Sequence, residues 1–317
     1  MGKEIFRPEG VYAAMLTPFD EKGKVNGTVL RKIVDFLIDK GIDGLYPVSS
    51  VGEFVHLNPE ENMEIMDICV DQAKGRVPVV PGVSASCAEK AVILAKHAEK
   101  IGCNGVVACA PYYFTVSQEI VEKHFEIIAD SISIPLVLYN IPFAANKITY
   151  DVVKRLSRRE NVVALKDSSG SMVDIVHFMD KIRIIGEDLT LLLGREDIFF
   201  PGLMMGATGC MVAAGCIVPE ILKRLHKCFK EGNYDEAREL QFSILILLRA
   251  MWSLTMPIGF KAAMELRGFP MGPFKQPLSD AEQYTYQITK SRIERIMTPL
   301  LEKIEKMEKE EKEVVKK

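Results

Sequence analysis

Short apolar runs alternate with longer segments of helical periodicity along most of the chain. Each run is rich in Val, Ile, Leu or Ala and ends in a small or polar residue, as expected for a strand that is buried on both faces. Eight such runs occur, at Val11–Leu16, Gly44–Val48, Val77–Pro81, Gly105–Ala110, Pro135–Tyr139, Val162–Lys166, Leu189–Leu193 and Cys210–Ala213. The segments between them carry helix signals, such as the N-cap and first-turn proline of Asn58-Pro59-Glu60 and the glycines that follow helices at Gly41, Gly75 and Gly102.

Eight strand–helix repeats predict a closed parallel barrel with helices outside, since eight is the number that closes a (β/α)8 TIM barrel. A doubly wound open sheet is the alternative, but it usually carries G-x-G-x-x-G after its first strand, where this chain has Leu16-Thr-Pro-Phe-Asp20. From about Asn233 only helical spacing remains. We therefore expect an α/β fold with a barrel domain over residues 1–232 and a C-terminal α-helical domain over residues 233–317. Its charged end, Lys303–Lys317, is predicted to be a solvated helix end or tail.

Composition excludes several classes of protein. The chain has 317 residues, of which 48% are hydrophobic and 26% charged, which is too apolar for a disordered chain. Its net charge of −3 gives no basic surface for nucleic acid. The most apolar segment, Phe242–Phe260, is too short and too interrupted to cross a membrane. The absence of a secretory signal and of any CxxC pair among seven cysteines predicts a reducing, cytoplasmic location without disulfides.

In a barrel, catalytic side chains lie at the carboxyl ends of the strands. One predicted strand ends in Leu165-Lys166-Asp167, and burial there would lower the pKa of the lysine and supply the neutral amine that forms a Schiff base. The preceding strand ends in Tyr139-Asn140, close enough for a phenol to carry protons beside that amine. Taken singly, Lys166 is an ordinary lysine at a loop start and Tyr139 a packing residue, so the pair is the informative feature.

The second strand ends in the loop Ser49-Ser50-Val51-Gly52-Glu53, whose hydroxyl and backbone N–H groups can bind an anion. A carboxylate is the expected guest because the loop has no Walker-type lysine for phosphates.

Five segments stand in order along the chain: Gly10–Phe19, Ser49–Glu53, Pro111–Tyr113, Leu138–Asn140 and Leu165–Asp167. Together they resemble the dihydrodipicolinate synthase/N-acetylneuraminate lyase family of class I aldolases. The resemblance implies a homotetrameric TIM barrel, a dimer of dimers, that binds pyruvate or releases it from a 2-oxo acid without a metal or other cofactor.

The resemblance also implies individual roles. Lys166 would form the Schiff base, Tyr139 would act as general acid and base, and Ser50 would bind the pyruvate carboxylate and relay protons. Tyr113 would reach into the site of a neighbouring subunit. Further substrate contacts are expected from Ser49, Val51, Gly52, Ser168, Gly194, Glu196 and Met211.

Three positions depart from the family's patterns. Val51 replaces the second hydroxyl of the usual loop, which casts doubt on a standard proton relay from Tyr113. Ala144 follows Tyr139-Asn-Ile-Pro-Phe143, where authentic dihydrodipicolinate synthases carry an Arg for the carboxylate of aspartate semialdehyde. Ala213 stands where the sialic acid lyases have a Ser, although Gly194-Arg-Glu-Asp197 keeps acidic groups.

The segments Tyr112–Phe114 and Lys166-Asp-Ser-Ser-Gly170 are most similar to the aldolases of 2-keto-3-deoxy sugar acids. Our main prediction is therefore reversible cleavage of such an acid to pyruvate and an aldehyde. The alternatives are dihydrodipicolinate (4-hydroxy-tetrahydrodipicolinate) synthesis from pyruvate and aspartate semialdehyde, a dehydratase or deaminase using the same imine, and a non-catalytic 2-oxo-acid-binding protein. A metal-dependent aldolase is disfavoured because the five histidines are scattered, with His97, His124, His177 and His226 in predicted helices.

Overall fold

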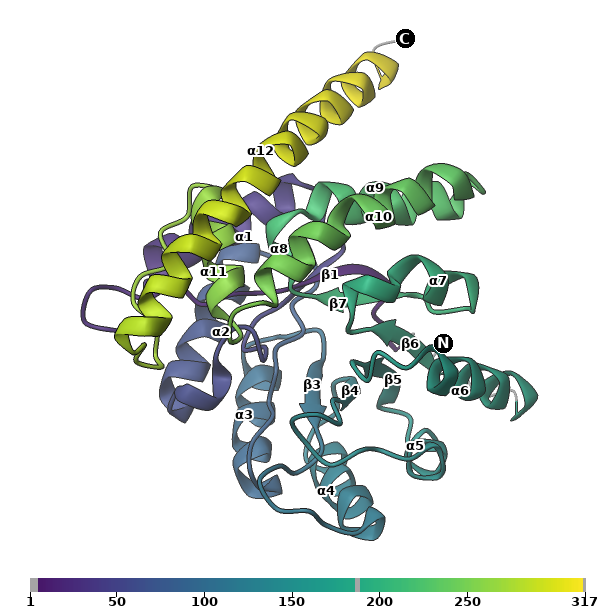
Figure 1. Ribbon diagram of the computed structural model, residues 1–317. Helices are drawn as coiled ribbons and strands as arrows, with labels where there is room; N and C mark the ends of the chain where they lie inside the picture. Colours follow the sequence, from purple (N-terminus) through teal and green to yellow (C-terminus); the bar gives the residue numbers. More distant parts are fainter. Residues whose placement is uncertain (1–4, 186–188, 316–317) are drawn as a thin grey trace.

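A curled parallel sheet wrapped by helices forms most of the molecule (Figure 1). The computed structural model describes residues 5–185 and 189–315. Its strands are β1 (Gly10–Ala14), β2 (Gly44–Tyr46), β3 (Val106–Cys109), β4 (Leu136–Asn140), β5 (Val162–Asp167), β6 (Thr190–Leu193) and β7 (Gly209–Val212). They lie in the order β2-β1-β7-β6-β5-β4-β3, and all the neighbouring pairs are parallel.

The segment expected as the third of eight strands, Val77–Pro81, closes the gap between β2 and β3. It does so through isolated bridges rather than as a regular strand. The N–H of Leu45 donates to the Pro78 carbonyl (2.9 Å), and the N–H of Val107 donates to the Pro81 carbonyl (2.9 Å). Pro78 and Pro81 have no N–H of their own, which limits how many ladder bonds the segment can form. The barrel prediction is confirmed, with this one strand reduced to bridges.

Helices alternate with the strands and cover the outside of the barrel (Figure 1). In chain order they are α1 (Gly27–Asp39), α2 (Pro59–Ala73), α3 (Ala88–Lys100), α4 (Gln118–Asp130), α5 (Tyr150–Leu156), α6 (Met172–Ile185), α7 (Phe199–Met204), α8 (Ala214–Ile217) and α9 (Pro219–Lys230). Two single-turn 3₁₀ helices, η1 (Phe54–His56) and η2 (Glu196–Ile198), follow β2 and β6.

Local signals explain where several helices start and stop. At α2, the Asn58 side chain accepts from the Glu61 N–H (2.8 Å) and the Glu61 carboxylate accepts from the Asn58 N–H (3.1 Å), which forms a capping box. At α4, the Ser117 hydroxyl accepts from the Ile120 N–H. The glycines predicted to follow helices all have positive φ, at 75°, 71° and 85° for Gly41, Gly75 and Gly102.

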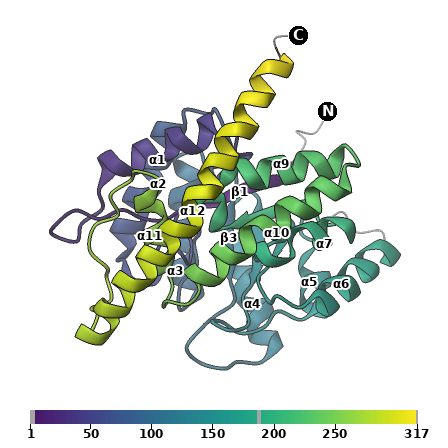
Figure 2. The same cartoon turned by 45° about the horizontal axis from the view of Figure 1, so that its top comes forward.

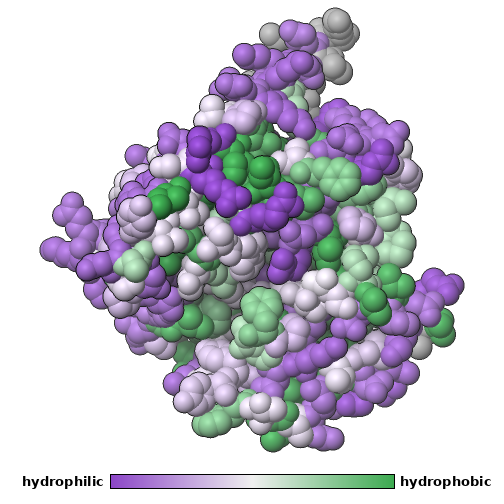
Figure 3. Space-filling view, viewed as in Figure 1, coloured by the Kyte–Doolittle hydropathy of each residue, from purple (hydrophilic) through white to green (hydrophobic). Residues whose placement is uncertain are grey.

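Three further helices complete the chain: α10 (Tyr234–Met251), α11 (Ile258–Leu266) and α12 (Asp280–Val315). Helix α10 packs on α7 and α9, α11 packs on α8, and α12 crosses both α10 and α11 (Figure 2). The charged end predicted from Lys303 onward continues α12 as far as Val315, and hydrophilic residues cover most of its projecting part (Figure 3). Among the described residues, no helix is both long enough and apolar enough to cross a membrane.

The core fills the barrel and the space between its strands and helices. Every residue of the seven strands is buried, including the polar residues Asn140, Lys166 and Asp167 at the carboxyl ends of β4 and β5. A buried lysine is costly unless its surroundings compensate, so these strand ends are where chemistry is expected.

Candidate active site

Strand register places three reactive side chains in one row. Cys109 on β3 pairs with Tyr139 on β4, and Tyr139 pairs with Lys166 on β5. Paired residues of parallel neighbours project to the same face of a sheet, so these side chains lie side by side. Each is less than 5% exposed. The two residues predicted from the strand ends, Lys166 and Tyr139, are therefore brought together.

Two aromatic rings flank the Lys166 amine. Its Nζ lies 3.9 Å from the centroid of the Tyr139 ring and 4.5 Å from that of Tyr46, on β2. Burial lowers the pKa of Lys166 to about 7, while the negative charge of Glu196 opposes that shift. A substantial fraction of the amine is therefore unprotonated at neutral pH, which is the form that attacks a carbonyl.

The Tyr139 hydroxyl has two neighbouring hydroxyl groups. The Ser168 Oγ lies 3.2 Å from it and also 3.2 Å from the Gly194 carbonyl, and Ser50 forms a side-chain hydrogen bond with the same phenol. Burial raises the pKa of Tyr139 to about 12, and these two hydrogen bonds oppose the rise. The phenol stays protonated at neutral pH and has a hydroxyl partner for proton exchange.

The loop after β2 is held by its own hydrogen bonds. The Ser49 hydroxyl donates to the Met15 carbonyl (3.0 Å) and accepts from the Gly52 N–H (3.1 Å), and the Thr17 hydroxyl donates to the Gly52 carbonyl (2.7 Å). A Cβ at Gly52 would come within 2.7 Å of the Met15 carbonyl oxygen, so only glycine fits without displacement. Ser49 is thus occupied in fixing the loop.

The backbone of this loop leaves two donors available. In residues 5–185 and 189–315, the N–H groups of Ser50 and Val51 meet no protein acceptor. The Val51 side chain is buried, at 4% exposed. A substrate carboxylate would satisfy such donors.

A carboxylate network ties β4 to the loop that follows Lys166. Asp167 Oδ2 accepts from the Asn140 amide (2.7 Å), and its Oδ1 accepts from the N–H (2.8 Å) and hydroxyl (2.5 Å) of Ser169. The Asn140 Oδ1 accepts in turn from the Ile148 N–H (3.1 Å). These bonds fix the end of β4 and the segment Asp167–Ser169, which directly follows Lys166 in the chain.

The other predicted substrate residues lie at the ends of β6 and β7. A Cβ at Gly194 would lie 2.0 Å from the Ser168 Oγ and 3.0 Å from the Lys166 Cε, so Gly194 borders the amine directly. Glu196, 2% exposed, accepts the Ala214 N–H (2.8 Å), and its burial raises its pKa. Met211 is fully buried within β7.

Tyr113 is separate from this cluster within one chain. It is 90% exposed, its ring packs edge-on against Phe114, and its φ of 81° is unusual for a bulky residue. Its predicted reach into a neighbouring subunit's site remains a prediction.

The sequence reasoning missed Tyr46, which flanks the amine with its ring. The sequence did contain a signal for it, because Tyr46 is an aromatic residue in a short strand that leads through Pro47 and Val48 into the predicted site loop.

A large groove lined by Gly10, Asp43 and Lys223 lies at the amino-terminal end of the barrel, away from Lys166. Its lining charges pair with one another, as in Lys223–Asp43, and it contains none of the predicted site residues.

The part of the chain that the structure describes contains no group of three or more His, Cys, Asp or Glu side chains placed to hold a metal ion. The four histidines predicted in helices are found in α3, α4, α6 and α9. His124 and His226 are buried, and that burial lowers the pKa of each to about 4.

Residues 7–296 match the model of the dihydrodipicolinate synthetase family. A 4-hydroxy-tetrahydrodipicolinate synthase of Pelobacter propionicus is 35% identical over 272 residues, covering 86% of this chain and 92% of that protein. The enzyme of the same name from Acetivibrio thermocellus is 34% identical over 295 residues, covering 93% and 98%.

Solved structures agree with the sequence comparisons. A crystal structure of dihydrodipicolinate synthase superposes with a TM-score of 0.84 at 30% identity, covering 92% of this chain and 99% of the other. YagE, a prophage protein of this family from E. coli K12 solved with pyruvate, also gives 0.84, at 28% identity and with 94% and 98% covered. The chain belongs to the dihydrodipicolinate synthetase family of pyruvate-dependent class I lyases.

Proposed function

We propose that Lys166 forms an imine with pyruvate at the carboxyl end of the barrel. The observation that carries this proposal is the buried Lys166 amine, with its lowered pKa, beside the Tyr139 ring. The Ser50 hydroxyl, with the free N–H groups of Ser50 and Val51, binds the pyruvate carboxylate. Gly194 lets the Ser168 hydroxyl and the Lys166 side chain pack directly against the backbone after β6, because a Cβ there would collide with both.

The neutral Lys166 amine attacks the C2 carbonyl of pyruvate, and loss of water gives the imine. The Tyr139 phenol, hydrogen-bonded to Ser50, supplies the proton that leaves with that water and later takes one from C3. The resulting enamine carbon adds to the carbonyl carbon of an aldehyde, which forms the new C–C bond, and the Tyr139 phenol gives its proton to the aldehyde oxygen. Hydrolysis then releases the product and restores the amine, and the reverse sequence cleaves a 4-hydroxy-2-oxo acid.

For the aldehyde, we propose aspartate semialdehyde, which makes the chain a 4-hydroxy-tetrahydrodipicolinate synthase. The support is that relatives bearing this name align over nearly their whole length at 30–35% identity. This was one of the alternatives in the sequence analysis, and the comparisons favour it over the sugar-acid aldolase that was our main prediction.

One observation keeps sugar-acid cleavage as a second candidate. Ala144 stands where the synthases carry a carboxylate-binding Arg, and no Arg occurs between Tyr139 and Tyr150. The hydroxyl of Ser168 lies beside Tyr139, where it can bind a hydroxyl of a 2-keto-3-deoxy sugar acid. A pocket that lacks a bidentate Arg discriminates less strongly for a second carboxylate.

A substrate panel tests the proposal. The protein is assayed with pyruvate and aspartate semialdehyde in the synthetic direction, and with 2-keto-3-deoxygluconate for pyruvate release. Higher kcat/KM with aspartate semialdehyde supports the synthase. Pyruvate release from the sugar acid alone supports the second candidate, and water or ammonia loss from a 2-oxo acid would support a dehydratase or deaminase. Imine formation without turnover in any of these assays would indicate a non-catalytic 2-oxo-acid-binding protein.

We also propose a homotetramer, a barrel domain ending at residue 232, and a cytoplasmic location. Tyr113 and Phe114, both largely exposed in one chain, are proposed to be covered in the assembly. Light scattering of the purified protein tests this, since a monomer at micromolar concentration would contradict it.

A further inference from the structure

Helix α11 carries one lysine in an otherwise apolar stretch. All seven residues from Ile258 to Met264 are buried, and Lys261 is 1% exposed. An ammonium group buried in such surroundings needs a charged partner, since its transfer from water costs several kcal/mol.

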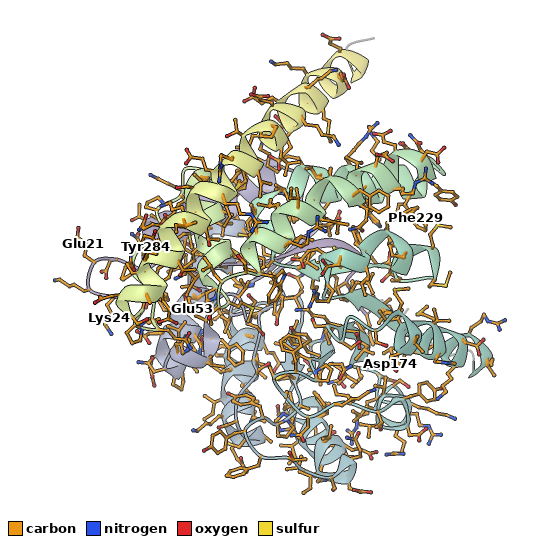
Figure 4. All side chains as sticks on the ribbon, in the orientation of Figure 1. Glu21, Lys24, Glu53, Asp174, Phe229 and Tyr284 are labelled. Carbon is orange, nitrogen blue, oxygen red and sulfur yellow. The ribbon has the colours of Figure 1, made fainter. Side chains whose placement is uncertain are left out.

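That partner is Glu53, the last residue of the loop after β2. The Lys261 Nζ lies 2.5 Å from the Glu53 Oε1, and the carboxylate is only 2% exposed. Apart from this contact, neither atom has a hydrogen-bonding partner in residues 5–185 and 189–315. The Lys261 Nζ also lies 4.2 Å from the centroid of the Phe19 ring. Figure 4 shows Glu53 between α2 and the C-terminal helices.

The backbone conformation of Glu53 is unfavourable for a residue other than glycine, and the ion pair with Lys261 can help to hold it. Its φ of 64° and ψ of 29° are left-handed, a conformation that costs a non-glycine residue about 1–2 kcal/mol. Its N–H donates to the Ser50 carbonyl (3.2 Å), so the conformation of Glu53 and the position of Ser50 are directly linked. The side chain of Glu53 is in turn fixed by Lys261.

We propose that Lys261 is a positioning residue, whose buried ion pair with Glu53 holds the Ser49–Glu53 loop in the conformation that presents Ser50 to Tyr139. The catalytic consequence rests on the proposed function, in which Ser50 binds the pyruvate carboxylate. The structural part, that a helix outside the barrel fixes this loop, does not depend on it.

Three variants separate this role from general stabilisation. Lys261→Met and Glu53→Gln each remove one charge; glutamine keeps the length of the glutamate side chain, and methionine is one atom shorter than lysine. The matched control is Arg267→Met, because Arg267 at the end of α11 also forms a largely buried ion pair. Its Nη2 lies 2.6 Å from Glu220, and its guanidinium stacks on the Phe36 ring. That pair lies away from the Ser49–Glu53 loop.

Two readouts are used, each at a fixed interval below the melting temperature of each variant. The first is amide hydrogen exchange of the peptide spanning residues 49–57. The second is the pyruvate concentration that gives half-maximal borohydride trapping. We expect Lys261→Met and Glu53→Gln to accelerate exchange in that peptide at least tenfold and to raise the half-saturating pyruvate concentration at least fivefold. Arg267→Met should change neither by more than twofold.

Equal behaviour of the three variants in hydrogen exchange would overturn the proposal. If Lys261→Met does not fold, Glu53→Gln alone decides the comparison. Failure of the proposed function has a different signature, because wild-type protein would then trap no pyruvate while the exchange comparison would still be informative. Faster exchange with an unchanged half-saturating concentration would overturn the catalytic part.

Discussion

The Lys166 Nζ lies 3.9 Å from the centre of the Tyr139 ring, and the two residues are direct partners in the β4–β5 register. The amine therefore faces the ring, while the phenol oxygen at the ring's far end meets Ser50 and Ser168. One tyrosine can thus shield the amine from water and exchange protons through its hydroxyl.

Replacing Tyr139 with Phe separates these two contributions. The ring stays beside the amine and only the proton carrier is lost, so we expect kcat to fall by about 10²–10⁴. Pyruvate should still be trapped by borohydride after long incubation. Tyr46→Phe is the control, because it removes a hydroxyl from the other aromatic ring that flanks the amine. Wild-type turnover in the Tyr139 variant would rule out the assigned role.

The rate of imine formation should depend on pH through Lys166. Because burial lowers the pKa of this amine to about 7, the reactive neutral form should increase as pH rises through that value. We expect the initial rate of borohydride trapping to rise with a midpoint near pH 7. An ordinary exposed lysine would give a rate that still climbs steeply at pH 9–10, and that profile would count against a buried amine.

The buried Lys166 amine should also lower the free energy of unfolding, by an amount that depends on pH. The folded pKa lies near 7, below the usual value of 10.5, so the unfolded chain binds one more proton between these values and stability rises with pH across this window. Lys166→Met should therefore stabilise the fold by about 1–3 kcal/mol at neutral pH, and the gain should shrink toward pH 10. Urea unfolding at both pH values measures it. A gain that grows with pH would contradict a lowered pKa.

The two serines of the loop should respond differently to removal of the hydroxyl. Ser49 bonds to the Met15 carbonyl and the Gly52 N–H, so Ser49→Ala should destabilise the fold by about 1–3 kcal/mol. Ser50 contacts Tyr139, so Ser50→Ala should leave stability nearly unchanged and lower kcat/KM by at least tenfold. Thermal unfolding and steady-state kinetics of both variants test this. The reverse assignment would show that Ser49 faces the substrate.

The sequence predicted the features that depend on local pattern. Apolar runs located the strands, and because parallel strands end at one edge, Lys166 and Tyr139 could be placed together without coordinates. Val77–Pro81 was less regular than its composition indicated because prolines interrupt its hydrogen bonding. The charged segment Lys303–Lys317 lacks apolar periodicity, so the sequence left open whether it is a helix end or a tail, and it continues α12 as far as Val315.

The ion pair between residues far apart in the chain could not be predicted from the sequence. Lys261 and Glu53 lie far apart in the chain, and only the packing of α11 against the barrel brings their charges into contact. The unusual feature that could have been noticed is a single lysine inside the apolar stretch Ile258–Met264. Its partner could not be identified, because the chain has many carboxylates and the hydrophobic periodicity does not indicate which of them lies near Lys261.

The most direct test of the account is to map the site of pyruvate attachment. The protein is incubated with pyruvate and sodium borohydride, and its intact mass and proteolytic peptides are measured by mass spectrometry. The account predicts one reduced pyruvyl group per chain, located on Lys166 and absent from Lys166→Met. An unmodified wild-type protein, or an adduct on another lysine such as Lys261, would contradict it.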